Sequence, residues 1–146
     1  SVVGNIEGQW FRKTGKLLQL SEQQLVDCDS MDHGCHGGNP IRAYTAVKMM
    51  GGLELSSDYP YEATQKKCRM ISSKFKAYVN ASVYLSQSEA YQAQYLMQHG
   101  PLSSALNAAG LQHYKGGIIH QPRERCNPMG INHGVLTVGY GTENGI

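Results

Sequence analysis

The sequence predicts an α+β fold in which a helical part precedes a β-rich part. Hydrophobic residues make up 40% of the 146 residues, which is enough to build a packed core. In the first half, apolar residues such as Val2, Ile6 and Trp10 recur at helical spacing. After about residue 80, short apolar runs are separated by glycine and proline turns, a pattern typical of strands. We therefore expect a helical lobe over residues 1–80 and a β-rich lobe over residues 81–146.

Three helices are expected in the first half, and each has a start or stop signal. The first runs from the first residues to about position 13 and ends near Gly15. The second begins at Ser21, which forms a capping-box pair with Gln24, while Leu20 and Leu25 form a hydrophobic staple. The third is marked by Asn39 as N-cap, Pro40 in the first turn and the Gly51-Gly52 stop.

The second half is expected to combine one further helix with several strands. The helix is predicted over residues 86–98, with Ser86 and Glu89 as a capping pair and Gly100-Pro101 as its stop. The predicted strands cover residues 75–85, 102–106, 117–120 and 135–140. Residues 53–73, which precede them, are expected to form loops.

Charge and hydropathy argue against two classes of partner. The formal net charge is only +2, and the basic residues are scattered instead of forming the stripe that binds nucleic acid. The sequence contains no apolar run long enough to span a bilayer and no signal-peptide pattern. We therefore expect neither a nucleic-acid partner nor a membrane partner.

The cysteines favour disulfide bonds over a metal site. They are Cys28, Cys35, Cys68 and Cys126, and they lack the close C-x2-C pairs of zinc sites. Free thiols in a cytosolic protein are one interpretation, and a disulfide framework in an oxidising compartment is the favoured one. His33 and His36 lie beside Cys35, but we interpret them as exposed loop residues and expect no metal and no cofactor.

One tripeptide matches the acceptor sequence for N-linked glycosylation. It is Asn80-Ala81-Ser82, which makes Asn80 a glycosylation candidate. The match fits a protein of the secretory route, although such tripeptides also arise by chance.

His133 is the strongest candidate for a catalytic residue. It lies in the segment GINHGVLTVGYG, after a turn and at the entrance of an apolar strand. A histidine in that place can face a cleft, and histidine ordinarily titrates near neutral pH, which suits a general acid or base. A single histidine is more often without a catalytic role, so the surrounding motifs carry the argument.

Those motifs form an ordered series along the whole chain. SEQQLVDCD, GCHGGNP, DYPYEA and HGPLSSALNAAG precede the histidine segment in that order. The series resembles the papain-like cysteine proteases, and among them the cathepsin F-like branch most closely. The resemblance implies a papain-like two-lobe fold in which both lobes belong to one peptidase domain, with the active site in the cleft between them.

The resemblance also implies that two catalytic groups lie outside this chain. In the family, the nucleophilic cysteine belongs to a CGSCWAF-type segment, which would place it four positions before Ser1. The asparagine that orients the histidine belongs to an NSWG-type segment, which would follow Ile146. We therefore interpret the chain as a fragment between these two motifs, and we expect it to be inactive alone.

Substrate-binding roles follow from the same resemblance. Gly38 would hydrogen-bond the substrate backbone, and Gly37 beside it also lacks a side chain, so that an extended peptide can approach closely. The pocket for the side chain two residues before the scissile bond would consist of Asn39, Pro40, Ala105, Ile131 and Gly134. Its small and apolar residues imply a hydrophobic preference, although Asn39 is polar where the family commonly has an aromatic or aliphatic residue. Asn132 either lines the primed side of the site or is only a turn residue.

The cysteine pairing is likewise implied by the resemblance. Cys28 is expected to pair with Cys68, closing a loop of about 40 residues and contributing about 3–4 kcal/mol to stability. Cys35 and Cys126 are expected to have their partners outside this chain and to be unpaired within it.

The function implied for the parent protein is that of a lysosomal or secreted cysteine endopeptidase made as an inactive precursor. His133 would form a thiolate-imidazolium pair with the external cysteine. Expected partners are protein or peptide substrates, cystatin-type inhibitors and the protein's own propeptide, and we expect a monomer. The alternative is a catalytically inactive papain-like homologue that acts as a binding or decoy protein.

Overall fold

The fold is seen in a computed structural model, which describes residues 1–122, 124 and 126–145. Within these residues it contains helices and one small antiparallel sheet, so the α+β composition agrees with the prediction. The elements are α1 (Val2–Thr14), α2 (Glu22–Cys28), η1 (Gly34–His36), α3 (Pro40–Met50), η2 (Ser72–Lys74), α4 (Glu89–His99), β1 (Leu102–Leu106) and β2 (His133–Thr137). None of the helices in the described part is long and apolar enough to cross a membrane.

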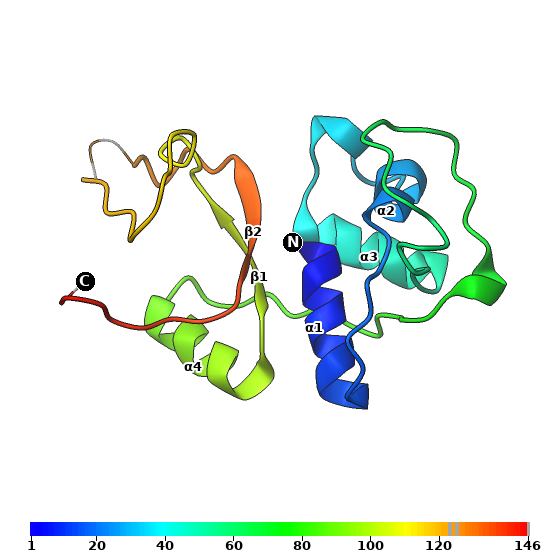
Figure 1. The fold of residues 1–146 in the computed structure, drawn as a ribbon, viewed down its shortest axis with the longest axis horizontal. Helices are drawn as coiled ribbons and strands as arrows, with labels where there is room; N and C mark the ends of the chain where they lie inside the picture. The colour runs from blue at the N-terminus through cyan, green and yellow to red at the C-terminus, as the bar shows by residue number, and fades with distance from the viewer. Residues whose placement is uncertain (123, 125, 146) are drawn as a thin grey trace.

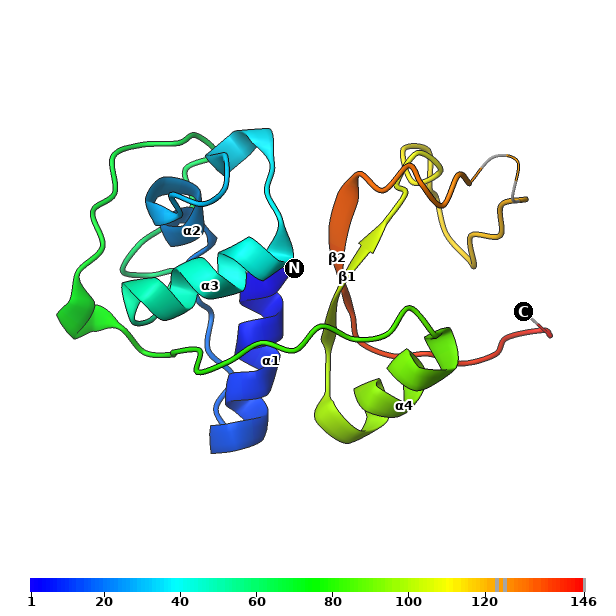
Figure 2. The same cartoon turned by 180° about the vertical axis from the view of Figure 1, so that it is seen from behind.

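The elements form two groups that meet along α1. Figure 1 shows α1, α2 and α3 together on one side, and α4 with the β1–β2 sheet on the other. The view from behind in Figure 2 shows the same two groups, with the chain before α4 passing from one to the other. β1 and β2 are antiparallel, and their register pairs Leu102 with Thr137 and Leu106 with His133. The predicted division of the lobes at residue 80 stays a prediction.

α1 is packed on two sides. On one side Val2, Val3 and Ile6 are buried in a hydrophobic core. On the other side the helix presents glycines to the sheet: a Cβ at Gly4 would lie 3.2 Å from Leu136, and one at Gly8 would lie 3.1 Å from Pro101. The absence of side chains there lets the sheet approach the helix backbone. The remaining buried members of the core are Leu20, Ala43, Val47, Leu53 and Ala77.

The predicted ends of the first three helices are confirmed. α1 ends at Gly15 with φ of 73°, and α3 ends at Gly51 with φ of 94°, a conformation that glycine adopts without strain. The side chain of Ser21 accepts a hydrogen bond from the backbone N–H of Gln24 at the start of α2. The Asn39 side chain accepts one from the N–H of Ile41, and Pro40 follows in the first turn of α3.

The capping box at α2 is only half formed. The Gln24 side chain does not reach back to Ser21, because its oxygen accepts from the Glu54 N–H at 2.8 Å and its nitrogen donates to the Gly52 carbonyl at 2.9 Å. Both bonds are buried, so this glutamine satisfies the backbone of a distant loop. Local spacing could not reveal a partner 28 or 30 residues away.

The prediction of a strand over residues 75–85 is wrong. The structure has only a single bridge in this segment, between Leu53 and Ala77. Apolar and aromatic residues favour strands when a neighbouring strand is available to pair with them. Beyond Ala77 the described residues offer no such neighbour, and Val83 and Tyr84 are exposed.

The helix predicted over residues 86–98 is present but begins later. α4 covers Glu89–His99, and its N-cap is Ser88, whose side chain accepts from the Tyr91 N–H. Ser86 is not the cap, because its hydroxyl accepts from the N–H of Ser88, which lies before the helix. The capping-box spacing with Glu89 favoured Ser86, whereas Ser88 has Tyr91 three residues on and no such signal.

Two further strand predictions differ from the structure. Residues 117–120 form no strand, and Gly116 and Gly117 have φ values of 155° and 76° that interrupt an extended run. The strand predicted over residues 135–140 instead covers His133–Thr137. Its end follows from its partner: Thr137 pairs with Leu102, and the residue before that is Pro101, which has no N–H to continue the ladder.

The predicted disulfide between Cys28 and Cys68 is present, and it joins the end of α2 to a loop 40 residues later. Cys35 and Cys126 carry free, exposed thiols. The expectation that these two cysteines pair outside the chain stays a prediction.

A buried carboxylate lies beside the disulfide. The Asp27 side chain is inaccessible to solvent and accepts hydrogen bonds from the Tyr59 hydroxyl at 2.7 Å, the Lys66 N–H at 2.8 Å and the Gln23 amide at 2.8 Å. Burial raises the pKa of Asp27, but these hydrogen bonds and the Arg69 charge outweigh it and lower the pKa overall. The carboxylate therefore joins α2 to the loop that contains Cys68.

Candidate active site

His133 is the first residue of β2, at the strand entrance that the sequence predicts. It lies opposite Leu106 in the sheet register, and its neighbour Gly134 lies opposite Ala105. The His133 side chain is exposed to solvent. The strand pairing thus fixes the backbone of the histidine and leaves its imidazole free to meet another group.

The N-terminus of α1 reaches this end of the sheet. The Ser103 hydroxyl donates a hydrogen bond to the Ser1 hydroxyl at 3.0 Å, and a Cβ at Gly134 would lie 3.2 Å from the same oxygen. His133 and the first residues of α1 therefore lie next to each other.

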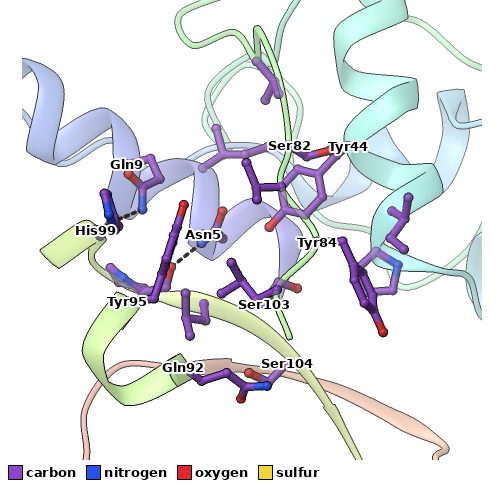
Figure 3. A pocket seen from close by; sticks show the side chains of 18 of the residues that line it. Asn5, Gln9, Tyr44, Ser82, Tyr84, Gln92, Tyr95, His99, Ser103 and Ser104 are labelled. Atoms are coloured by element: carbon purple, nitrogen blue, oxygen red, sulfur yellow. Dashed lines mark hydrogen bonds between the residues drawn. The ribbon is translucent and has the colours of Figure 1, made fainter. Parts of the chain in front are cut away.

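Side chains on α1 hold this arrangement by hydrogen bonds to residues 98–101, which comprise the end of α4 and the turn before β1. Asn5 and Gln9 donate from their amides at 2.5 Å and 2.6 Å, and Arg12 donates from both guanidinium NH2 groups. Figure 3 shows the bonds of Asn5 and Gln9 as dashed lines. Asn5 donates to the carbonyl oxygen of Pro101, and Gln9 donates to that of His99. Arg12 donates to the carbonyl oxygens of both Gln98 and His99. No local sequence pattern predicts these contacts, because the partners are 86 to 96 residues apart.

The two glycines of GCHGGNP differ in their surroundings. Gly37 has φ of 108°, and a Cβ there would meet no atom within 4 Å, so its backbone is open to an approaching peptide. At Gly38 a Cβ would lie 2.8 Å from the Asp32 side chain. Asp32 in turn accepts the Asn39 N–H at 2.9 Å. The close approach of Asp32 therefore leaves no room for a side chain at position 38. The sequence pattern did not show this steric reason for a glycine.

Four of the predicted pocket residues line one cavity. It has a volume of about 1170 Å³ and lies between α1 and α3 on one side and α4 and β1 on the other, as Figure 3 shows. The four are Asn39, Pro40, Ala105 and Ile131. The other predicted site residues, Gly37, Gly38, Asn132, His133 and Gly134, are not part of its lining.

Apart from Asn39, sequence reasoning missed the polar residues of this cavity. Tyr44 and Ser103 line it together with Asn5. Burial raises the pKa of the Tyr44 hydroxyl, and a hydrogen bond with Ser103 opposes that rise. The sequence identifies Tyr44 only as a residue of the predicted third helix. Its partner Ser103 lies 59 positions later in a strand, so no local pattern connects the two residues.

Two predicted site asparagines use their side chains for local structure. Asn39 caps α3, which explains a polar residue at this position. The Asn132 side-chain oxygen accepts the Ala108 N–H at 2.9 Å, and the backbone N–H of Asn132 donates to the Leu106 carbonyl at 3.1 Å. Asn132 thus has the role of a turn residue, and its placement on the primed side of the site stays a prediction.

Comparisons with known proteins identify relatives over the whole chain. Mouse cathepsin F is 49% identical over 146 residues, which are all of this chain and 32% of that protein. Cathepsin F of Drosophila melanogaster is 41% identical over 145 residues, or 99% of this chain and 24% of that protein. The chain therefore spans about a third or less of these relatives.

Solved structures with the same fold are also found. The digestive procathepsin L2 proteinase from the larval midgut of Tenebrio molitor matches with a TM-score of 0.92 and 36% identity, covering 99% of this chain and 46% of that one. The Carica candamarcensis cysteine protease CMS1MS2, solved in complex with E-64, matches with a TM-score of 0.82 and 37% identity, covering 97% of this chain and 65% of that one. These similarities confirm the predicted papain-like fold. The family model described as papain family cysteine protease matches residues 1–146, and the chain belongs to that family.

Proposed function

We propose that the full-length protein is a cysteine-type endopeptidase in which His133 pairs with a thiolate supplied from just before α1. The observation that carries the proposal is the contact between the N-terminus of α1 and β2, where Ser1 lies against Gly134 beside the histidine. In the family pattern the nucleophile precedes Ser1 by four residues, which is about 6 Å of helix, or one turn. That distance is short enough to bring the cysteine sulfur beside the imidazole.

The chemistry follows from the properties of the pair. The imidazolium of His133 lowers the pKa of the cysteine and so favours the thiolate. The thiolate attacks the peptide carbonyl carbon, and His133 then donates its proton to the leaving amine as the C–N bond breaks. Water hydrolyses the resulting thioester, with His133 accepting the proton, and the thiolate is regenerated.

Substrate recognition is proposed to involve the glycine loop and the cavity. The open backbone at Gly37 supports main-chain binding of an extended peptide along residues 37–38. Pro40, Ala105 and Ile131 line the same cavity, and Ile131 is 53% exposed, which leaves apolar surface for a substrate side chain. We infer a hydrophobic preference for the side chain two residues before the scissile bond, with Asn39 and Gly134 completing the pocket.

The cellular context is part of the same proposal. The disulfide between Cys28 and Cys68 requires an oxidising compartment, which supports a lysosomal or secreted protein. One structural relative is described as a procathepsin, which supports a precursor whose propeptide binds the cleft. Cystatin-type inhibitors are proposed as further partners, and a monomer as the working form.

The deciding experiment compares variants of the full-length protein on a dipeptidyl fluorogenic peptide. His133→Ala is expected to lower kcat/KM by about 10² to 10⁴-fold, because it removes the general acid and base. His113→Ala, a change of an exposed histidine in the β region, is the matched control and should retain activity.

Two results would overturn the proposal. One is unchanged activity in His133→Ala. The other is a residue other than cysteine four positions before Ser1, which would favour a non-catalytic binding protein.

A further inference from the structure

One side chain connects the helical group to the sheet beside the proposed active site. Tyr44 belongs to α3, and its ring is partly buried against the hydrophobic core. Its hydroxyl forms a hydrogen bond with Ser103, a residue of β1. Figure 3 shows Tyr44 extending from α3 toward the side of the cavity on which Ser103 lies. A tyrosine side chain has only two rotatable bonds, so a ring held by the core leaves its hydroxyl little freedom.

Ser103 continues this connection to α1. Its hydroxyl donates a hydrogen bond to the Ser1 hydroxyl at 3.0 Å, and a hydroxyl can bond a second group at the same time. Ser103 lies opposite Leu136 in the sheet, and a Cβ at Gly4 would lie 3.2 Å from Leu136. Residues opposite each other in a strand pair share a face of the sheet, so Ser103 lies on the face that packs on α1. We call Tyr44, Ser103 and Ser1 the hydroxyl chain.

The hydroxyl chain ends at the start of α1, next to β2. A Cβ at Gly134, the residue after His133, would lie 3.2 Å from the Ser1 hydroxyl oxygen. In the proposed mechanism the nucleophilic cysteine precedes Ser1 by about one helical turn. The hydroxyl chain thus joins three elements, α3, β1 and α1, at the point where the two reacting groups must meet. A misplacement of reacting groups by about 1 Å can lower a rate by about 100-fold.

We propose that Tyr44 is a positioning residue, which holds the start of α1 through Ser103 and Ser1 and so sets the distance between the thiolate and His133. The inference rests on the proposed peptidase function. Removing the Tyr44 hydroxyl leaves Ser103 with one partner fewer, and a serine hydroxyl rotates between staggered positions unless its partners hold it. Phenylalanine keeps the ring and its packing against the core, so Tyr44→Phe separates the role of the hydroxyl from that of the fold.

A contact between Tyr44 and the substrate is the competing explanation, because Tyr44 also lines the cavity. The two explanations differ in what they change. A lost substrate contact weakens binding and raises KM, whereas a displaced thiolate-imidazolium pair lowers kcat. Iodoacetamide is too small to need the cavity, so its alkylation of the cysteine reports on the pair alone.

The experiment measures peptide hydrolysis and alkylation by iodoacetamide in the full-length protein. Tyr44→Phe is expected to lower kcat by about 3- to 10-fold, the effect of one hydrogen bond, and to leave KM within about twofold. Its alkylation should need a higher pH to reach the wild-type rate, because the thiolate is paired less well. Tyr91→Phe, the same change at an exposed residue of α4 outside the cavity lining, is the matched control and should behave as the wild type.

Ser103 provides a second test within the hydroxyl chain. Ser103→Ala should lower kcat at least as much as Tyr44→Phe, and Ser103→Thr, which keeps a hydroxyl and suits a strand, should retain activity. Because both residues act through the same chain, the double variant Tyr44→Phe/Ser103→Ala should lose no more than Ser103→Ala alone. Losses that multiply would show that the two residues act independently and would overturn the proposal.

Failure of this inference differs from failure of the proposed function. A Tyr44→Phe variant with the kcat and the alkylation profile of the wild type, or with a raised KM alone, overturns the positioning role. If His133→Ala abolishes activity in the same series, the proposed function stands in either case. A wild-type protein without peptidase activity overturns both.

Discussion

The helical region and the β region of this protein are stabilised in different ways. α1, α2 and α3 enclose a core in which Val47 and Leu53 are fully buried, and a disulfide and a buried carboxylate lie beside it. Among the described residues after Ala77, Leu96 is the one hydrophobic side chain that is buried. The β region instead rests on α1 through glycine contacts and hydrogen bonds. The proposed site lies where these two kinds of structure meet.

Because of this difference, we expect the helical region to resist unfolding and the β region to open more readily. Regions with few buried apolar contacts open locally at lower free energy than the core. Val138 at 72% and Met129 at 88% exposure show how little apolar surface the β region covers. Substitutions in the two regions should therefore have unequal effects on the free energy of unfolding.

The largest effect is expected from opening the disulfide. Cys28→Ser should lower the free energy of unfolding by about 3–4 kcal/mol, because the unfolded chain regains the freedom of a long loop. Urea denaturation without reductant measures it. The control is Cys35→Ser, a change of a free and exposed cysteine, which should cost less than about 0.5 kcal/mol. Equal losses in the two variants would show that the bridge does not stabilise the helical region.

Truncation of matched valines tests the contrast in packing. Val47→Ala should cost about 2 kcal/mol, because it leaves a cavity in a fully buried position. Val138→Ala removes the same two methyl groups from an exposed position and should cost less than about 0.5 kcal/mol. Denaturant midpoints of the two variants give the comparison directly, and similar shifts would contradict it.

The buried carboxylate predicts how the helical region responds to acid. The folded-state pKa of Asp27 is lowered, so its stabilisation is fully present above the ordinary aspartate pKa of about 3.9 and declines as pH falls through the lower folded value. Asp27→Asn should cost about 1–3 kcal/mol at neutral pH and show a weaker loss of stability below about pH 4. Thermal unfolding between pH 2 and 7 measures both slopes; parallel curves would exclude this role for Asp27.

The smallest effects are expected at the helix caps. Ser21→Ala should cost about 1 kcal/mol, because the hydroxyl is buried and accepts the Gln24 N–H at 2.9 Å. Ser88→Ala should cost less, since that hydroxyl is exposed and its bond to the Tyr91 N–H is 3.4 Å long. A larger loss at Ser88 than at Ser21 would reverse the comparison.

The same contrast explains what could be predicted from sequence. Helix ends such as Gly15, Ser21 and Asn39 depend on one residue and its near neighbours, so their signals are local. The strand predictions for residues 75–85 and 117–120 are wrong, because an apolar run does not show whether a partner strand exists. A sequence motif predicted His133 at a strand entrance. The proximity of Ser1, in contrast, results from the packing of the sheet against α1 and has no local signal in the sequence.

The proposed pairing of His133 with a thiolate just before α1 is tested most directly by alkylation of that thiolate. The rate of inactivation by iodoacetamide is followed against pH in the full-length protein and in His133→Ala. With the histidine present, alkylation should remain fast below pH 6, because the paired thiol has a pKa well under the ordinary value of about 8.5. In His133→Ala the profile should move toward that ordinary value. Identical profiles in the two proteins would contradict the pairing, and with it the proposed mechanism.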